Sequence, residues 1–191
     1  MLRALASTCV VAGCMLVVSA PSSAQEIIHA LTGTVSAIDN AGKTITVFQD
    51  SGSKGVFQDM SNPKTHISFD KKIAAETTAA TVFDKQGAYV IVFYFGNGDD
   101  NRTVVALKSL GAGPFSSTDG TVTNFDSRTH SISVADKSGK VETFRIGDQT
   151  VAESDMGAVE GIRFHAQKGD QVRVVSSNVG GNPTALFVRD L

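Results

Sequence analysis

A cluster of oxygen-bearing side chains lies in the segment GNGDDN, residues 96–101, where Asn97, Asp99, Asp100 and Asn101 occur together. Carboxylate and amide oxygens are the ligands that Ca²⁺ prefers, so this segment is a candidate cation-binding loop. It lacks the spacing and the distal glutamate of an EF-hand loop. Asn, Asp and Gly are also the residues that dominate hairpin turns. The sequence therefore favours a turn and leaves the cation loop as an alternative.

The histidines do not form a recognisable metal-binding or catalytic motif. His29, His66, His130 and His165 are far apart in the sequence. The chain contains no Gly-x-Ser-x-Gly elbow, no His-Glu-x-x-His pair and no phosphate-binding Walker loop. His130 stands in a turn-like segment, which is typical of a surface histidine. We therefore expect no metal site and no cofactor.

Two pairs of carboxylates could in principle carry out acid–base chemistry, namely Glu153 with Asp155 and Asp99 with Asp100. Such chemistry needs a group whose pKa is shifted by burial or by a neighbouring charge. Both pairs lie in polar, turn-like sequence, where we expect nothing to desolvate them. The sequence therefore predicts that the protein is not an enzyme.

The first 24 residues have the pattern of a signal peptide. Arg3 supplies a positive charge, an apolar segment follows, and small residues precede the expected cleavage after Ala24. A lipoprotein with Cys14 as its first residue is the alternative, but the apolar segment continues past that cysteine. Cys9 and Cys14 are the two cysteines of the chain, so a chain cleaved after Ala24 has no thiol. The pattern predicts a periplasmic or secreted protein.

The charges of the chain are balanced and scattered. Its formal net charge is −2, and no run of five like charges occurs. A nucleic-acid-binding domain would carry a basic stripe, so we expect no nucleic-acid partner. No segment after the signal approaches the 20 or so apolar residues that a membrane-spanning helix needs, so we expect no membrane span.

An internal repeat specifies the elements that must position these side chains. Residues 31–47 align without gaps to residues 118–134, with six of seventeen positions identical, where composition alone would give about one. The identical pairs are Gly33/Gly120, Thr34/Thr121, Val35/Val122, Asp39/Asp126, Ile45/Ile132 and Val47/Val134. Residues 101–110 match residues 182–191, so the first repeat is six residues longer in its middle. The chain is a tandem duplication.

Each repeat predicts five short strands. The first strand must bend between Val35 and Ile38, because a spacing of three does not keep two residues on one face. Turn residues follow at 39–43 and 126–130. The third strand is expected near residues 65–70 in the first repeat, and at 142–146 in the second. The fourth and fifth strands are expected at 89–95 and 103–110, with counterparts at 171–177 and 184–191.

Five short strands with a bent first strand are typical of a small closed barrel, in which closure removes exposed strand edges. The fold class predicted is all-β, with two tandem five-stranded OB-like barrels. The first barrel is expected at residues 25–110 and the second at 118–191, with a linker at 111–117 that is rich in Gly, Pro and Ser.

The segment 89–95 is apolar on both faces. Val90, Val92 and Tyr94 match Val172, Val174 and Ser176 of the second repeat, which favours this face as the barrel interior. The opposite face comprises Tyr89, Ile91, Phe93 and Phe95. Its counterpart in the second repeat is mostly polar. Since a soluble monomer seldom leaves such a surface bare, we predict that these four residues contact the other barrel, the six extra residues of repeat one, or a partner.

The frame GxVxxxD, followed by a late GDxVxV strand at residues 169–174, resembles small secreted bacterial OB-like barrel domains of unknown function. More distantly, repeat one resembles the periplasmic copper- and silver-binding barrels of metal-efflux systems. Both resemblances imply a five-stranded barrel.

The metal function of that second family does not follow from the resemblance. Its members carry a histidine soon after strand two and a Trp-Pro-x-Met-x-Met segment. Here Phe48 and Gln49 occupy the histidine position, and Asn62, Thr65 and Ile67 replace the tryptophan and the two methionines. Copper(I) selects sulfur ligands, and the barrel frame is kept without them.

Together these features predict an exported, non-catalytic binding or assembly module, with an unknown protein partner or self-association. The alternative is a periplasmic small-ligand or cation-binding protein, which would use the loop at 96–101 or a cleft between the barrels.

Overall fold

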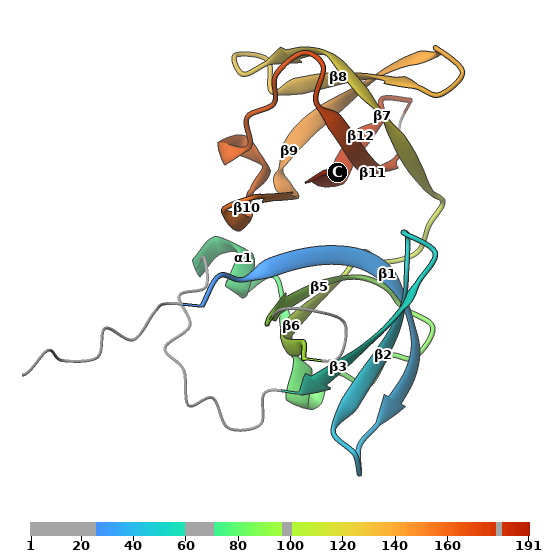
Figure 1. Ribbon diagram of the computed structural model, residues 1–191, viewed down its shortest axis with the longest axis vertical. Helices are drawn as coiled ribbons and strands as arrows, with labels where there is room; N and C mark the ends of the chain where they lie inside the picture. Colours follow the sequence, from blue (N-terminus) through green and yellow to red (C-terminus); the bar gives the residue numbers. More distant parts are fainter. Residues whose placement is uncertain (1–25, 60–70, 97–100, 179–180) are drawn as a thin grey trace, which may run out of the picture.

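The structure, a computed structural model, describes residues 26–59, 71–96, 101–178 and 181–191. Over this part the chain is nearly all β, which confirms the predicted fold class. The strands form two sheets of six strands each, one from each repeat (Figure 1).

The first sheet closes into a barrel. It comprises β1 (His29–Asp39), β2 (Thr44–Gln49), β3 (Lys54–Asp59), β4 (Thr78–Ala79), β5 (Tyr89–Phe95) and β6 (Thr103–Ser109). The strand order is β3-β2-β1-β5-β6-β4, and an additional pairing of β3 with β6 completes a ring of five strands. Helix α1 (Lys71–Ala75) and the 3-10 turn η1 (Ala80–Val82) precede β5.

The second sheet closes in the same way. It comprises β7 (Phe115–Asp126), β8 (Ser131–Asp136), β9 (Val141–Ser154), β10 (Gly157–Glu160), β11 (Gln171–Ser177) and β12 (Thr184–Asp190), with the 3-10 turn η2 (Gly161–Arg163). The order is β10-β9-β12-β11-β7-β8, and the pairing of β9 with β8 completes the ring. Strand β7 begins at Phe115, within the segment 111–117 expected as linker, and its first residues pair with β11.

The first hairpin of each barrel turns by the same local chemistry. The Asp39 carboxylate accepts hydrogen bonds from the backbone N–H groups of Ala41 and Gly42. Asp126 does the same for the two residues at equivalent positions in the second barrel. Lys43 and His130, at the ends of the two turns, both have positive φ, 51° and 49°. The repeated aspartate therefore nucleates the turn, and the predicted turn position of His130 is confirmed.

The predicted bend in the first strand is confirmed as a bulge in each barrel. The pairing of β1 with β2 shifts register between Val35 and Ala37. The pairing of β7 with β8 shifts at the equivalent place, between Val122 and Asn124.

The third strand of the first barrel was predicted at the wrong place. It lies at β3, residues 54–59, because a short turn after β2 returns the chain directly along that strand. Phe57 fills the barrel there, as Phe144 of β9 does in the second barrel. The segment 65–70, where the strand was expected, lies outside the described residues.

The face of β5 that matches the second repeat points into the first barrel, as the repeat alignment predicts. Val90, Val92 and Tyr94 belong to the core of the first barrel. Val172 and Val174 belong to the core of the second. The outer face of β5 is consequently available for contacts outside its own barrel.

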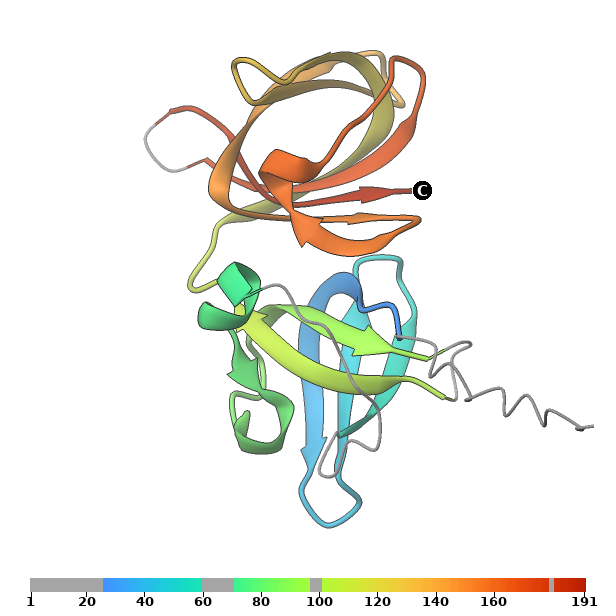
Figure 2. The ribbon, with the colours of Figure 1, turned by 90° about the vertical axis from the view of Figure 1, so that its left-hand side faces the viewer.

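The two barrels are stacked one on the other, with the segment before β7 passing between them (Figure 2). Among the described residues, no helix has the length and apolar character required to cross a membrane.

Candidate functional site

An apolar cluster joins the two barrels. Ile91 and Phe93, from the outer face of β5, have no exposed surface and pack with Val151, Val175 and Phe187 of the second barrel. Tyr89 and Phe95 are partly buried against the same cluster. All four residues of the predicted contact face therefore lie between the barrels.

The elements that meet are β1, β5, β6 and α1 of the first barrel and β9, β10, β11 and β12 of the second. The second repeat contributes through Val175 and Phe187. The face of β11 that matches the outer face of β5 contributes one apolar residue, Val175, beside the polar Gln171, Arg173 and Ser177.

Glu153 of β9 forms a polar contact across the seam between the barrels. Its Oε1 accepts a hydrogen bond of 2.7 Å from His29 Nδ1, and its Oε2 accepts one of 2.7 Å from the Ala30 backbone N–H. Glu153 is only 5% exposed. Burial raises the pKa of this carboxyl above its ordinary value, although the two hydrogen bonds and the charge of Arg189 act in the opposite direction.

The expectation that nothing would desolvate Glu153 is therefore wrong. The residue lies in strand β9, and the first barrel covers it. Its carboxylate holds the Nδ1–H of His29 and fixes the tautomer of that ring. A histidine whose ring is held by a carboxylate can act as a base. Here, however, both oxygens of Glu153 accept hydrogen bonds from β1 and so link β1 to β9.

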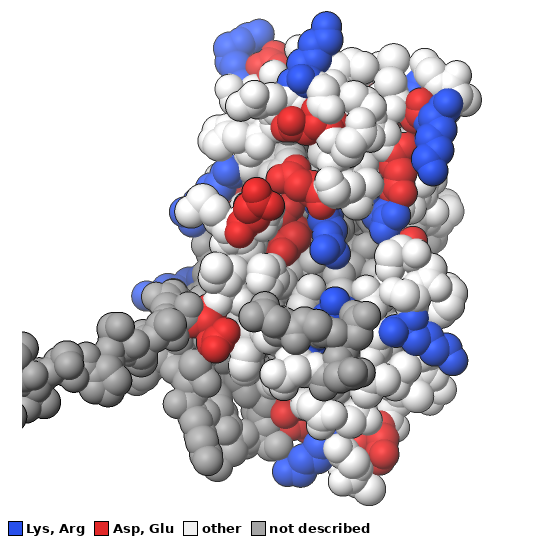
Figure 3. Space-filling model, viewed as in Figure 1, with Lys and Arg blue, Asp and Glu red and all other residues white. Residues whose placement is uncertain are grey.

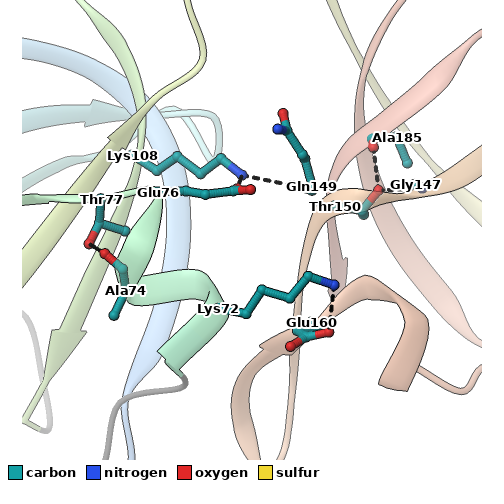
Figure 4. Close-up of polar contacts among 10 residues, drawn as sticks. All are labelled: Lys72, Ala74, Glu76, Thr77, Lys108, Gly147, Gln149, Thr150, Glu160 and Ala185. Atoms are coloured by element: carbon teal, nitrogen blue, oxygen red, sulfur yellow. Dashed lines mark hydrogen bonds and ion pairs between the residues drawn. The ribbon is translucent and has the colours of Figure 1, made fainter.

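Lys108 forms a second polar contact across the seam, shown in Figure 4. Its Nζ donates to Glu76 Oε2 at 2.5 Å and to the backbone oxygen of Gln149 at 2.8 Å. Lys72 donates to Glu160 nearby at 3.3 Å. Lys108 is only 8% exposed, so the Glu76 carboxylate and the Gln149 carbonyl take the place of water around its ammonium group.

A third group of polar residues lies on the side of β1 and β11. Asp50 Oδ2 accepts hydrogen bonds from the hydroxyls of Thr32, at 2.6 Å, and Tyr89, at 2.5 Å. Burial, and then the neighbouring Asp50 carboxylate, raises the pKa of the Tyr89 phenol. Arg173 binds Asp119 through two hydrogen bonds of 2.6 Å each. These bonds hold the pKa of Asp119 below its ordinary value.

A cleft of about 450 Å³ opens where the end of β2 faces β11 and β12. The first barrel contributes Gln49, Ser51, Ser53, Tyr94 and Arg102 to its lining. The second barrel contributes Arg173, Arg189, Asp190 and Leu191. The cleft therefore exists only while the two barrels are docked.

Aromatic rings hold one wall of this cleft in place. The guanidinium of Arg102 lies 5.2 Å from the ring centroid of Tyr94 and 5.9 Å from that of Phe57. The ring of His29 lies 5.8 Å from that of Tyr94. A cation–π contact orients a guanidinium, so the two rings fix the position of Arg102 in this wall.

Arg173 separates this cleft from a second hollow of about 570 Å³, which is more open to solvent. The second hollow is lined by Asp50, Asp119, Asp136 and Lys137 among others. On the face seen in Figure 3, acidic and basic side chains lie next to one another where the second barrel meets the first.

The candidate cation loop is mostly outside the described part of the chain. Asn97, Asp99 and Asp100 are not described, and Asn101 is exposed. Within the described residues, no group of three or more His, Cys, Asp or Glu side chains could hold a metal ion.

Sequence reasoning missed the residues that line the cleft. Arg102, Arg173 and Arg189 are far apart in the chain, and each looks like an ordinary surface arginine. One signal was present for Arg173, which stands between Val172 and Val174 at the position where the first repeat has Ile91.

No protein-family model matches this sequence, and neither does any curated protein. Among solved structures the chain is similar to apo-CusF, residues 6–88, from Escherichia coli. The sequences are 16% identical over 44% of this chain and 94% of that chain, with a TM-score of 0.33. A similarity at this level carries no information about a ligand of this chain.

Proposed function

We propose that this protein is a non-catalytic, periplasmic or secreted binding module, in which two docked barrels hold a small ligand in the cleft between them. The observation that carries the proposal is the cleft of about 450 Å³ with lining from both barrels. Small-molecule sites are concave, fall in the range of roughly 300–1,000 Å³, and occur preferentially at domain interfaces.

The apolar face of β5 supports this function over assembly with a partner protein. Ile91 and Phe93 are fully buried against the second barrel. A partner could reach them only if the barrels separated. We assign the four-residue face the role of fixing the two barrels, which keeps the walls of the cleft in place.

The hydroxyls near the cleft support binding over catalysis. A nucleophilic serine needs a base within hydrogen-bond reach. Here Ser51 Oγ and Ser53 Oγ lie 3.0 Å apart and bond to each other. The imidazole of His29 is held by Glu153. The described residues around the cleft can therefore form hydrogen bonds to a ligand, but they do not include a serine with a base in position to remove its proton.

A binding screen with a blocked cleft tests the proposal. Small molecules of neutral, anionic and cationic classes are tested against the purified protein by thermal shift and then by calorimetry. We expect at least one class to bind. Ser53→Trp places a large side chain at the cleft and should weaken that binding at least tenfold.

Ser127→Trp is the matched control, because Ser127 is exposed in the first turn of the second barrel, away from the cleft lining. It should bind as the unchanged protein does. The proposal fails if no class of compound binds, or if Ser53→Trp binds as tightly as the control.

A further inference from the structure

We infer that the first barrel has a second binding site, which takes a single aromatic ring carrying a neutral or cationic polar group. The site is a pocket of about 300 Å³ at the end of the barrel where β1 turns into β2, away from the second barrel (Figure 1). Its described lining lies entirely within residues 38–83. The site is therefore independent of the cleft between the barrels.

The floor of the pocket is apolar and accessible. Ile45, Ala80 and Phe83 belong to the core of the first barrel, and Ile38 is partly buried against that core. Ala80 and Phe83 each keep 5% of their surface exposed. A ring that lies on these side chains removes apolar surface from water. Since an engineered apolar cavity of about 150 Å³ binds benzene, the volume of this pocket suffices for one ring.

The second barrel shows which group fills the equivalent position. Phe125 is the counterpart of Ile38 in the repeat alignment and in the strand register. Its ring packs edge-on against Phe164, with the ring centroids 6.2 Å apart. Phe164 is in turn the counterpart of Phe83, because each follows a 3-10 turn and donates its backbone N–H to the first residue of that turn. A ligand ring in the first barrel would take the place that the Phe125 ring has in the second.

A second difference between the barrels enlarges the pocket and makes one side of it polar. Asp59 is the counterpart of Ile146. The backbone N–H of each donates to the last residue of the preceding turn, which is Lys43 in the first barrel and His130 in the second. Ile146 belongs to the core of the second barrel, whereas Asp59 brings a carboxylate to the pocket. At both positions the second barrel has the larger apolar side chain, so space is left in the first.

The charges of the lining favour a neutral or cationic group on the ring. Asp39 and Asp59 contribute two carboxylates, and Lys43 contributes one ammonium group. The hydroxyl of Thr81 adds a further hydrogen-bond acceptor at the exposed side of the pocket. Because the carboxylates outnumber the ammonium group, they should attract a cationic ring and disfavour an anionic one.

An NMR titration with three probes that share one ring tests the inference. Benzylamine, benzyl alcohol and benzoate are cationic, neutral and anionic at pH 7. We expect the first two to shift the backbone amide resonances of residues 38–45 and 80–83, and benzylamine to bind at least threefold more tightly than benzoate. The equivalent residues of the second barrel, 125–132 and 161–164, should not shift. The inference is wrong if neither region shifts, if both shift equally, or if benzoate binds as tightly as benzylamine.

Variants locate the ring. Ile38→Phe gives the first barrel the side chain that the second barrel has at this position, so it should weaken the binding of benzyl alcohol at least tenfold. Ile162→Phe is the matched control, because Ile162 lies in the second barrel and is 40% exposed. It should bind as the unchanged protein does. An Ile38→Phe variant with the affinity of this control would overturn the inference, and the titration of the unchanged protein does not depend on the folding of either variant.

The contribution of the carboxylate is tested separately. Asp59→Asn keeps the size of the side chain and removes its charge, so it should reduce the advantage of benzylamine over benzyl alcohol. An unchanged advantage would contradict the role given to Asp59.

Failure of this inference is distinguishable from failure of the proposed function. Ser53 lines the cleft between the barrels, whereas this pocket is at the other end of the first barrel. Ser53→Trp should therefore leave the binding of benzyl alcohol unchanged. If Ser53→Trp abolishes that binding, the ring binds in the cleft, which contradicts the second site and supports the proposed function.

Discussion

Gly33 and Gly120 occupy the same position in the two repeats because a side chain there would meet backbone. A Cβ added to Gly33 would lie 2.4 Å from the carbonyl oxygen of Phe48. One added to Gly120 would lie 2.1 Å from that of Ala135, which is the equivalent residue. The glycine allows the first strand to cross closely over the second, just before the bulge that bends it.

Gly33→Ala should therefore destabilise the protein by about 1–3 kcal/mol, the usual range for overpacking a filled site. Gly147→Ala is the control, because an added Cβ there would have no neighbour closer than 3.8 Å. It should leave the free energy of unfolding unchanged or raise it by about 0.4–1 kcal/mol. Urea denaturation measures both, and equal effects at the two positions would contradict the steric explanation.

Glu153 makes stability depend on pH in a direction that can be worked out. Burial raises its pKa in the folded protein, so the folded state binds this proton more tightly than the unfolded state does. The contribution of Glu153 to stability is then largest below its unfolded pKa of about 4.3. It decreases as pH rises through the folded value.

Glu153→Gln should remove this dependence. As pH rises above about 4.3, the unchanged protein should lose stability relative to the variant. Urea denaturation across pH 4 to 7.5 measures it, and a difference that moves the other way would contradict the assignment. Glu153→Ala also leaves the buried Ala30 N–H without its acceptor, which should cost about 1–3 kcal/mol.

Strand β5 has two apolar faces because each faces a different core. Val90 and Val92 fill the barrel to which the strand belongs, and Ile91 and Phe93 fill the contact with the second barrel. The alternation expected of a strand with one solvated face is therefore absent.

Phe93→Ala should destabilise the protein by about 3–5 kcal/mol, the typical loss for a fully buried phenylalanine. The control is Phe48→Ala, because Phe48 lies on β2 and is 50% exposed. It should change the free energy of unfolding by no more than about 0.5 kcal/mol. Urea denaturation compares them, and a Phe93 variant as stable as the Phe48 variant would show that the contact between barrels contributes little.

The two barrels share one apolar cluster together with the polar contacts of Glu153 and Lys108. Removal of either barrel would expose the apolar side chains of the other. The whole molecule should therefore unfold as one cooperative unit, although each barrel has its own core.

Scanning calorimetry should give a single transition whose calorimetric and van't Hoff enthalpies agree. Combining Phe93→Ser with Val175→Ser places polar groups in the contact from both sides. We expect this double variant to unfold in two separate steps, one for each barrel. Two transitions in the unchanged protein would contradict the shared cluster.

The sequence by itself determined the all-β class and the bend of the first strand in each internal repeat, because these follow from local patterns of turn residues and alternating side chains. It also identified the apolar face of β5 as a surface in need of cover. The gapless alignment, if continued past residue 47, pairs Phe57 with Phe144 and would have placed the third strand correctly.

Tertiary structure alone decided what covers that face and what surrounds Glu153. It also brought Arg102, Arg173 and Arg189 to one cleft. These outcomes depend on how two closed barrels dock, and docking joins residues far apart in the sequence, such as His29 and Glu153, which are 124 positions apart. No local pattern records such a contact, because burial and electrostatic environment arise only when separate surfaces meet.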